Sequence, residues 1–291
     1  MLDHTVSTPD GRTLLVQEGG DPRGAPILFH GGTPNSRLLA PSAAARAAAR
    51  GVRLISYDRP GYGGSSRQEG RTVADCAADV RVIAEALGID SLRVYGLSGG
   101  GPHALACAAR LEDLVPAVAT VGSVAPWEAE GLDYFAGMGE INVEDTELYL
   151  RDPAGSREKL EAERVELLAA DAGEMLEAWA TLLSPADAAV LTGEYAEHLV
   201  AGLRDGLGAG GDGWWDDGVA HMEPWGFDCA DIRTPTLIVH GEQDRFVPFQ
   251  HGEWLAVHIP GAEAWLSEDD GHLTPLERRL EDVLDWLLAR M

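Results

Sequence analysis

The sequence predicts an α/β protein with a mostly parallel sheet and helices on both of its faces. Short β-rich runs alternate with helical patterns up to about Val121, and the alternation resumes at Pro235–His240. Between these two regions the strand pattern stops and helical patterns dominate. With 291 residues and 45% hydrophobic content, the chain can bury one large core, or a core together with a lid.

The first expected element is a β-hairpin, because Pro9-Asp10-Gly11 is a turn signal between the β-rich runs His4–Ser7 and Thr13–Glu18. Thr72 with Asp75 three residues later is an N-terminal capping pattern and opens the second expected helix. The other expected elements up to Val121 are the strands Pro26–Phe29, Arg53–Tyr57, Leu92–Leu97 and Val115–Val121, and the helices Leu38–Arg50, Thr72–Leu87 and Gly99–Arg110.

The end of the chain continues this alternation after a long interruption. Its expected elements are the strands Pro235–His240 and Ala262–Leu266 and the helices Glu253–His258 and Leu276–Leu288. The interruption differs in composition, with 24 Asp and Glu but only 5 Lys and Arg between Ser123 and Asp228. We therefore expect a core domain of residues 1–122 and 232–291 and a helical cap of residues 123–231.

Within the expected cap, Ser156–Ala170 and Glu174–Leu183 are the clearest helical stretches. The Gly-rich run Gly206–Gly213 is expected to be flexible. It contains a G-x-G-x-x-G pattern but has no preceding strand, so the pattern does not predict dinucleotide binding.

The composition argues against several classes of function. The net charge of −26 repels phosphate backbones, which disfavours nucleic-acid binding. The sequence has no run of about 18 apolar residues, so it does not predict a membrane span. Its first residues lack the apolar region of a secretory signal. The three cysteines, Cys76, Cys107 and Cys229, lack metal-ligand spacing and are typical of reduced, buried thiols. We expect a cytoplasmic protein, either a monomer or a homodimer, whose partner is a small-molecule substrate.

A candidate nucleophile lies at Ser98, in Gly96-Leu97-Ser98-Gly99-Gly100. The G-x-S-x-G pattern is weak alone, but here a predicted strand precedes it and a predicted helix follows it. This context is that of a nucleophile elbow, where a tight turn exposes the serine hydroxyl and requires very small flanking residues. The helix N-terminus behind Ser98 favours developing negative charge.

A serine hydroxyl needs a base, and the base needs a carboxylate that orients it. His272 is the candidate base, because it follows Gly271 between the last strand and the last helix and so emerges on the same sheet edge as Ser98. Asp244 is the candidate carboxylate, since it follows the strand Pro235–His240 and completes the chain order Ser, Asp, His. Glu242, or an acid after the strand Val115–Val121, remains an alternative.

The oxyanion of such a reaction also needs donors. One expected donor is the backbone N–H of Gly99, just after the nucleophile, and the other is the N–H of Gly32, in the loop after the strand Pro26–Phe29. Glycine at these positions allows the backbone to approach the substrate oxygen closely.

Four motifs now stand in order along the chain: His30-Gly31-Gly32-Thr33-Pro34-Asn35-Ser36, Asp58-Arg59-Pro60-Gly61-Tyr62-Gly63-Gly64-Ser65, Gly96-Leu97-Ser98-Gly99-Gly100, and Gly241-Glu242-Gln243-Asp244 with Gly271-His272. As a set they resemble the α/β-hydrolase fold family, in the serine hydrolase branch with a helical cap. The resemblance implies an eight-stranded, mostly parallel sheet with the cap inserted after strand 6, an acyl-enzyme mechanism and no cofactor or metal. It also implies that His30 and Asp58 are structural, and a serine nucleophile disfavours the dehalogenase and epoxide hydrolase branches.

The expected reaction is hydrolysis of a carboxylic ester of a small to medium apolar or aromatic molecule, through an acyl-enzyme on Ser98. The pocket is expected between the sheet edge and the cap, and apolar cap residues are candidate substrate-binding residues: Trp127, Tyr134, Phe135, Met138, Trp214, Trp215, Met222 and Trp225. Three alternatives stay open: an aminopeptidase similar to the proline iminopeptidases, a carbon–carbon bond hydrolase or perhydrolase, and a ligand-binding protein on a hydrolase fold. In the proline iminopeptidases the first motif begins His-Gly-Gly-Pro, where this chain has Thr33.

Overall fold

The computed structural model describes residues 1–290 and contains one eight-stranded sheet in the order β1-β2-β4-β3-β5-β6-β7-β8. β1 and β2 pair antiparallel at one edge, β2 is also antiparallel to β4, and all the remaining pairs are parallel. The strands are β1 (Leu2–Ser7), β2 (Thr13–Gly20), β3 (Ala25–His30), β4 (Val52–Tyr57), β5 (Arg93–Leu97), β6 (Val118–Val121), β7 (Thr236–Gly241) and β8 (Glu263–Ser267).

Two layers of helices bury the two faces of the sheet. Helices α1 (Pro41–Ala48) and α11 (Thr274–Leu288) pack on one face, where Leu284 and Leu287 share a hydrophobic cluster with Leu54 and Val239. Helices α2 (Cys76–Ala86), α3 (Gly101–Arg110) and α10 (Phe249–His258) pack on the other. The predicted fold class, a mostly parallel eight-stranded sheet between helices, is confirmed.

Several element boundaries differ from the prediction by a few residues, and two of these differences have a clear local cause. The first helix begins at Pro41 rather than Leu38, because Ala40 is extended and Pro41 occupies the first turn, where its missing N–H costs nothing. Strand β6 begins at Val118 rather than Val115, since Val115 N–H donates to Leu111 O and still belongs to the turn after α3.

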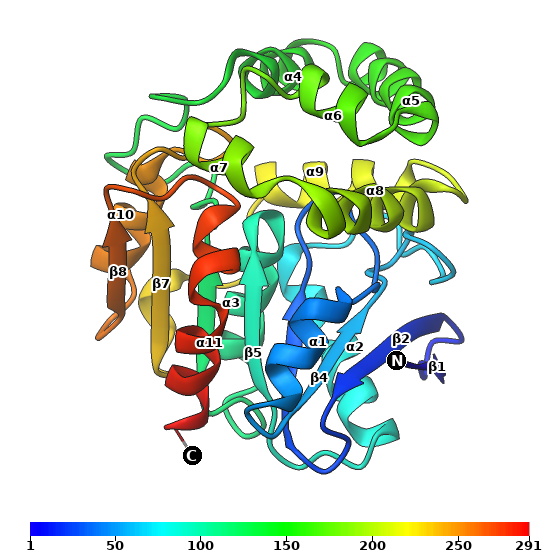
Figure 1. Ribbon diagram of the computed structural model, residues 1–291, viewed down its shortest axis with the longest axis vertical. Helices are drawn as coiled ribbons and strands as arrows, with labels where there is room; N and C mark the ends of the chain where they lie inside the picture. Colours follow the sequence, from blue (N-terminus) through cyan, green and yellow to red (C-terminus); the bar gives the residue numbers. More distant parts are fainter. Residues whose placement is uncertain (291) are drawn as a thin grey trace.

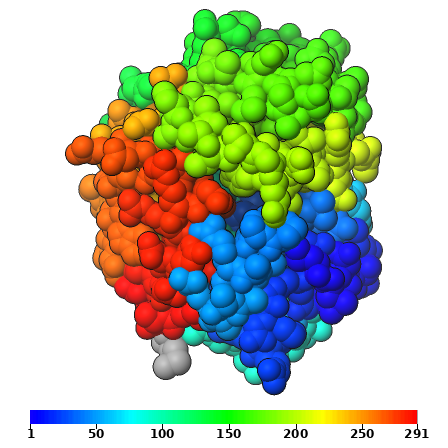
Figure 2. Space-filling view, viewed as in Figure 1, coloured from blue at the N-terminus to red at the C-terminus, as the bar shows by residue number. Residues whose placement is uncertain are grey.

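Six helices lie between β6 and β7: α4 (Glu140–Arg151), α5 (Pro153–Ala169), α6 (Ala172–Ala178), α7 (Pro185–Val190), α8 (Gly193–Leu207) and α9 (Asp212–Met222). We call residues 122–235, which carry these helices, the cap segment. In Figure 1, α7, α8 and α9 lie directly over the ends of the strands, and α4, α5 and α6 form an outer layer. In Figure 2 the cap segment rests on the core across a seam, with a small recess between the cap and the blue and red parts of the core. The boundary at residues 123 and 231 stays a prediction.

The loop within the Gly206–Gly213 run is shorter than predicted and spans only residues 208–211. Helix α8 continues through Gly206, and α9 already begins at Asp212. The glycines instead allow close backbone contact with the loop after β4: Gly63 N–H donates to Gly206 O at 2.9 Å, and Gly213 N–H donates to Gly61 O at 3.2 Å. Within residues 1–290, no helix has the length and apolar character that crossing a membrane requires.

Candidate active site

Ser98 lies at the turn between β5 and α3, at the carboxyl end of the strand. Its φ of 53° makes it the one non-glycine residue among residues 1–290 with a left-handed backbone. Such a conformation is costly for a residue with a Cβ and persists only where the surrounding structure enforces it. The turn therefore has the strained geometry that the sequence pattern predicts for a nucleophile elbow.

Two residues near Ser98, Gly96 and Gly100, must be glycine because backbone atoms surround them. A Cβ on Gly96 would collide with the carbonyl of Gly100, and a Cβ on Gly100 would collide with the carbonyls of His30 and Gly31. The turn is thus packed directly against the loop after β3, which carries Gly32.

Asp244 and His272 follow the adjacent strands β7 and β8 and form a buried pair. His272 Nδ1 lies 2.7 Å from Asp244 Oδ2, and each residue is less than 5% exposed. Burial alone would lower the pKa of His272, but the charge and hydrogen bond of Asp244, together with Asp187, outweigh it and raise that pKa. Because Nδ1 is engaged by Asp244, Nε2 is the atom that can accept a proton.

The carboxylate of Asp244 is held from several sides. Its Oδ1 accepts from the backbone N–H groups of Phe246 and Val247, both at 2.9 Å. His240 Nε2 lies 3.3 Å from Oδ2, and the Phe246 ring stacks on His272 at 4.7 Å. Burial would raise the pKa of Asp244, but His272 and the hydrogen bonds lower it to about 2. His240, which begins the His-Gly-Glu-Gln-Asp stretch, was not among the predicted site residues.

Gly32 lies beside Ser98 as predicted for an oxyanion loop. A Cβ on Gly32 would lie 3.5 Å from the Cβ of Ser98 and 4.0 Å from its Oγ. The carbonyls of Gly31 and Gly32 accept hydrogen bonds from the Arg59 guanidinium at 2.6 and 3.0 Å. Because these carbonyls point to Arg59, the side chain of Arg59 fixes the orientation of this loop.

Gly99, the other predicted donor, is fixed through its carbonyl. His103 Nδ1 donates to Gly99 O at 2.9 Å, and His221 Nε2 donates to it at 3.0 Å. Burial lowers the pKa of His221 to about 4 and that of His103 well below its usual value. Both rings are therefore neutral near pH 7, and a neutral ring donates from one nitrogen only. His221 comes from α9, and nothing in the sequence separates it from the other histidines.

A buried ionic network joins α9 to these loops. The Asp217 carboxylate pairs with Arg59 and Arg71, each at 2.6 Å, and accepts from Thr33 Oγ1 at 2.8 Å and from Tyr62 at 3.0 Å. Burial would raise the pKa of Asp217, but the two guanidinium groups outweigh it and hold that pKa well below its usual value. Part of the acidic excess of the cap segment thus neutralises arginines of the core.

The predicted substrate-binding residues occupy several different environments. Trp127, Tyr134 and Phe135 contact one another, and Tyr134 packs edge-on against His251 of α10. The remaining aromatic candidates lie elsewhere: Trp214 packs in the cluster of Tyr62, Met175 and Leu203, Trp215 contacts Tyr149 and Arg157, and Trp225 is buried in the core beside Phe227. These contacts favour packing roles for Trp214, Trp215 and Trp225. Met138 and Met222 are half-buried, and their role stays a prediction.

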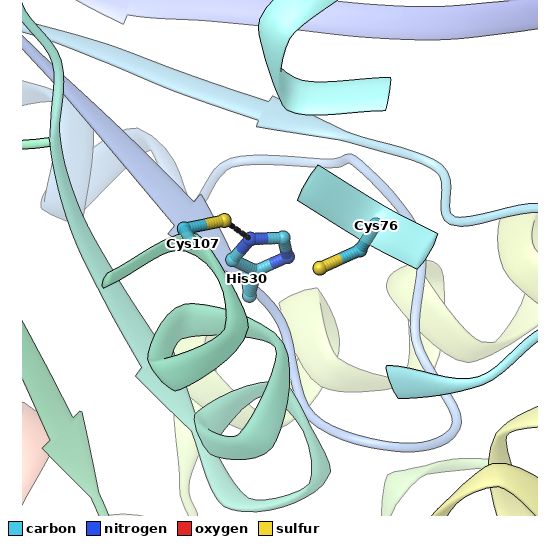
Figure 3. Close-up of side chains that lie close together, drawn as sticks. All are labelled: His30, Cys76 and Cys107. Atoms are coloured by element: carbon cyan, nitrogen blue, oxygen red, sulfur yellow. Dashed lines mark hydrogen bonds between the residues drawn. The ribbon is translucent and has the colours of Figure 1, made fainter. Parts of the chain in front are cut away.

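Among residues 1–290, one group of three side chains lies close enough together, and is of the right residue types, that it could hold a metal ion. One ligand atom each from His30, Cys76 and Cys107 lies within 4.8 Å of the others, and all three residues are buried. Figure 3 shows the His30 ring between the two thiols, with Cys107 Sγ 3.6 Å from His30 Nε2. Burial, with Arg59 nearby, lowers the pKa of His30 to about 3, and burial raises the pKa of Cys76. The arrangement fits neutral groups packed in the core better than a cation site.

Comparison with known proteins assigns the family. Residues 25–278 match the family described as the alpha/beta hydrolase fold. The chain belongs to the α/β-hydrolase fold family. The AB hydrolase superfamily protein YisY of Bacillus subtilis (strain 168) is 28% identical over 274 residues, which cover 93% of this chain and 92% of that protein.

Two further comparisons extend over almost the whole of this α/β-hydrolase. The proline iminopeptidase of Neisseria meningitidis serogroup B is 28% identical, with 94% of each chain covered. The crystal structure of a putative aryl esterase from Burkholderia cenocepacia has a TM-score of 0.69 at 24% identity, covering 99% of this chain and 100% of that one, which shows a shared fold. The family match and the similarity to these relatives show that this protein is a hydrolase.

Proposed function

We propose that this α/β-hydrolase cleaves carboxylic esters of small to medium apolar or aromatic molecules through an acyl-enzyme on Ser98. The observation that carries the proposal is the convergence at one sheet edge. Ser98 lies at a strained turn after β5, the Gly32 backbone lies against it, and the His272–Asp244 pair follows β7 and β8 of the same parallel set.

The reaction divides into two steps, acylation and deacylation of Ser98, and His272 transfers the proton in both. Ser98 Oγ attacks the ester carbonyl while His272 Nε2 takes its proton, and the backbone N–H groups of Gly32 and Gly99 stabilise the oxyanion. His272 then gives the proton to the departing alcohol. Water, deprotonated by His272, attacks the acyl-enzyme, and the acid leaves as Ser98 regains its proton.

The state of the buried carboxylates favours a substrate without a positive charge. Asp244 is engaged by His272, and Asp217 is engaged by two arginines. Asp187 accepts three backbone N–H groups, that of His272 and those of the two residues after it. None of these three has a free charge for a substrate ammonium, which an aminopeptidase must bind.

The second candidate is an aminopeptidase, which the similarity to a proline iminopeptidase over 94% of both chains favours. Comparison of p-nitrophenyl esters with prolyl arylamides separates the two. We expect a higher kcat/KM for the esters, and a higher kcat/KM for the arylamides would overturn our ranking.

The serine mechanism itself has a separate test. We expect sustained hydrolysis of short p-nitrophenyl esters, labelling of Ser98 by a fluorophosphonate, and a loss of at least about 10⁴-fold in kcat for Ser98→Ala. Ester binding without turnover or labelling would instead support a ligand-binding protein.

A further inference from the structure

Asp187, on the short helix α7 of the cap segment, lies against the start of α11. Its side chain is fully buried, and its two oxygens accept three consecutive backbone N–H groups. Oδ2 accepts from His272 at 2.9 Å, and Oδ1 accepts from Leu273 at 2.7 Å and from Thr274 at 3.2 Å. One cap side chain therefore binds the very peptide that carries the candidate base.

Helix α11 needs this acceptor because it has none of its own. The first N–H groups of a helix lack intrahelical partners, and a side chain at the N-cap normally accepts from them. The N-cap residue here is Leu273, which makes no such bond. Asp187, 85 residues before His272 in the sequence, accepts instead from Thr274, the first residue of the helix, and from the two residues before it.

Residues of both the cap segment and the His272 loop shape this contact. Ser184 Oγ donates to Asp187 Oδ2 at 2.8 Å, so the carboxylate has four donors. Gly271 lies opposite, and a Cβ at that position would collide with the Asp187 carboxylate and with Ser184 Oγ. Gly271 is thus the residue that lets the cap segment approach the His272 loop.

We propose that Asp187 is a positioning residue for His272, so that both the cap segment and Asp244 hold the base in position. The inference rests on the proposed function, in which His272 is the base. Its consequence is that the cap segment completes the catalytic apparatus in addition to covering it. The charge of Asp187 also favours the imidazolium that forms during the reaction.

The groups that face His272 come from three elements. Asp244 follows β7 and engages Nδ1, and His240 of β7 faces Asp244 in turn. Asp187 of α7 faces the backbone of His272, and the Phe246 ring covers the imidazole. Both carboxylates raise the pKa of His272, so removal of the Asp187 charge moves the protonation of His272 to lower pH.

The test compares Asp187→Asn with Asp171→Asn. Asp171 is a matched control, because it also caps a cap-segment helix, accepting from Gly173 and Glu174, but does so within its own helix α6. For Asp187→Asn we expect kcat to fall by about 10- to 100-fold, as for a small displacement of a catalytic group, with KM within about threefold of wild type. The acid limb of its kcat/KM profile should move to lower pH. Asp171→Asn should keep both the kcat and the pH profile of the wild type.

Two results would overturn the proposal. One is a wild-type kcat and pH profile in folded Asp187→Asn. The other is a loss of kcat that Asp171→Asn shares at equal loss of stability, which would indicate a general effect of weakening the cap segment.

Should Asp187→Asn fail to fold, amide hydrogen exchange on the wild-type protein decides instead. Strong protection of the amides of His272, Leu273 and Thr274 supports the contact, and rapid exchange at all three overturns it. This measurement also separates the two proposals. If the wild type neither hydrolyses esters nor labels at Ser98, the proposed function fails, while exchange still reports whether Asp187 holds the His272 loop.

Discussion

Asp217 of α9 and Arg59 of the loop after β4 form a buried ion pair, with 2.6 Å between Asp217 Oδ2 and Arg59 Nη2. Their side chains are 0% and 5% exposed. Arg59 also donates to the carbonyls of Gly31 and Gly32. The pair thus links the cap segment to the loop that carries the proposed oxyanion donor.

Arg59→Met should lower both stability and activity. It leaves Asp217 with Arg71 as its remaining guanidinium partner, and breaking a buried pair on one side costs about 3–5 kcal/mol of unfolding free energy. The Gly31–Gly32 loop also loses its donor, so kcat should fall. Urea denaturation and ester kinetics measure the two effects.

Arg67→Met is the control for this prediction, because Arg67 pairs with Asp216 of the same helix but its side chain is 32% exposed. A partly exposed pair contributes about 1 kcal/mol or less. Equal losses of stability in the two methionine variants would contradict the role given to Arg59.

Gly213→Ala should loosen the cap segment from the core. A Cβ at Gly213 would lie 2.6 Å from Tyr62 Cδ2 and 2.7 Å from the carbonyl carbon of Gly61. We expect a loss of about 1–3 kcal/mol in unfolding free energy, as for other overpacked sites. Gly218→Ala, in the same helix with nothing within 4 Å of its Cβ, should instead be neutral or gain up to about 1 kcal/mol. Thermal and urea unfolding distinguish them, and a neutral Gly213→Ala would refute the close contact.

The pH dependence of kcat/KM should show an acid limb above pH 6.5. The base acts in its neutral form, and the pKa of His272 is raised from 6.5, chiefly because Asp244 outweighs the effect of burial. As the pH falls through the raised pKa, His272 is protonated and activity is lost. A profile for an aryl ester measured in buffers of constant ionic strength tests this, and a midpoint below 6.5 would contradict it.

Asp244→Asn should lower kcat by about 10⁴-fold, because the imidazole loses its orienting carboxylate and its preferred tautomer. The remaining acid limb should move to lower pH, since a negative charge next to His272 is gone. Glu242→Gln is the control. Glu242 was the alternative carboxylate and is exposed, so this variant should keep the wild-type kcat. A large loss of kcat in Glu242→Gln with little loss of kcat in Asp244→Asn would show that Glu242, and not Asp244, orients His272.

Local patterns made the core of the site predictable. A strand, a Gly-rich turn and a helix in direct succession indicated the Ser98 turn, because that geometry depends on adjacent residues. Asp244 and His272 were predictable from their places after two strands, since carboxyl ends of parallel strands lie at one edge. The structure brings these two into contact at 2.7 Å.

The cap residues could not be chosen in the same way. The chain has 48 acidic residues, and no local pattern separates the buried Asp187 and Asp217 from the exposed majority. Their partners lie far away in the sequence: Asp187 binds the peptide of His272, and Asp217 binds Arg59. The role of the Gly206–Gly213 run was missed for a related reason, because its end glycines contact Gly61 and Gly63, and only the folded chain forms this contact.

By itself, the sequence determined the sheet, the Ser98 turn and the order of Ser98, Asp244 and His272, since these follow from local propensity and the parallel arrangement of strands. Only the tertiary structure decided how the cap segment meets the core, because burial and distance arise when distant segments pack. That packing brings Asp187 to the His272 loop, Asp217 to Arg59 and His221 to Gly99.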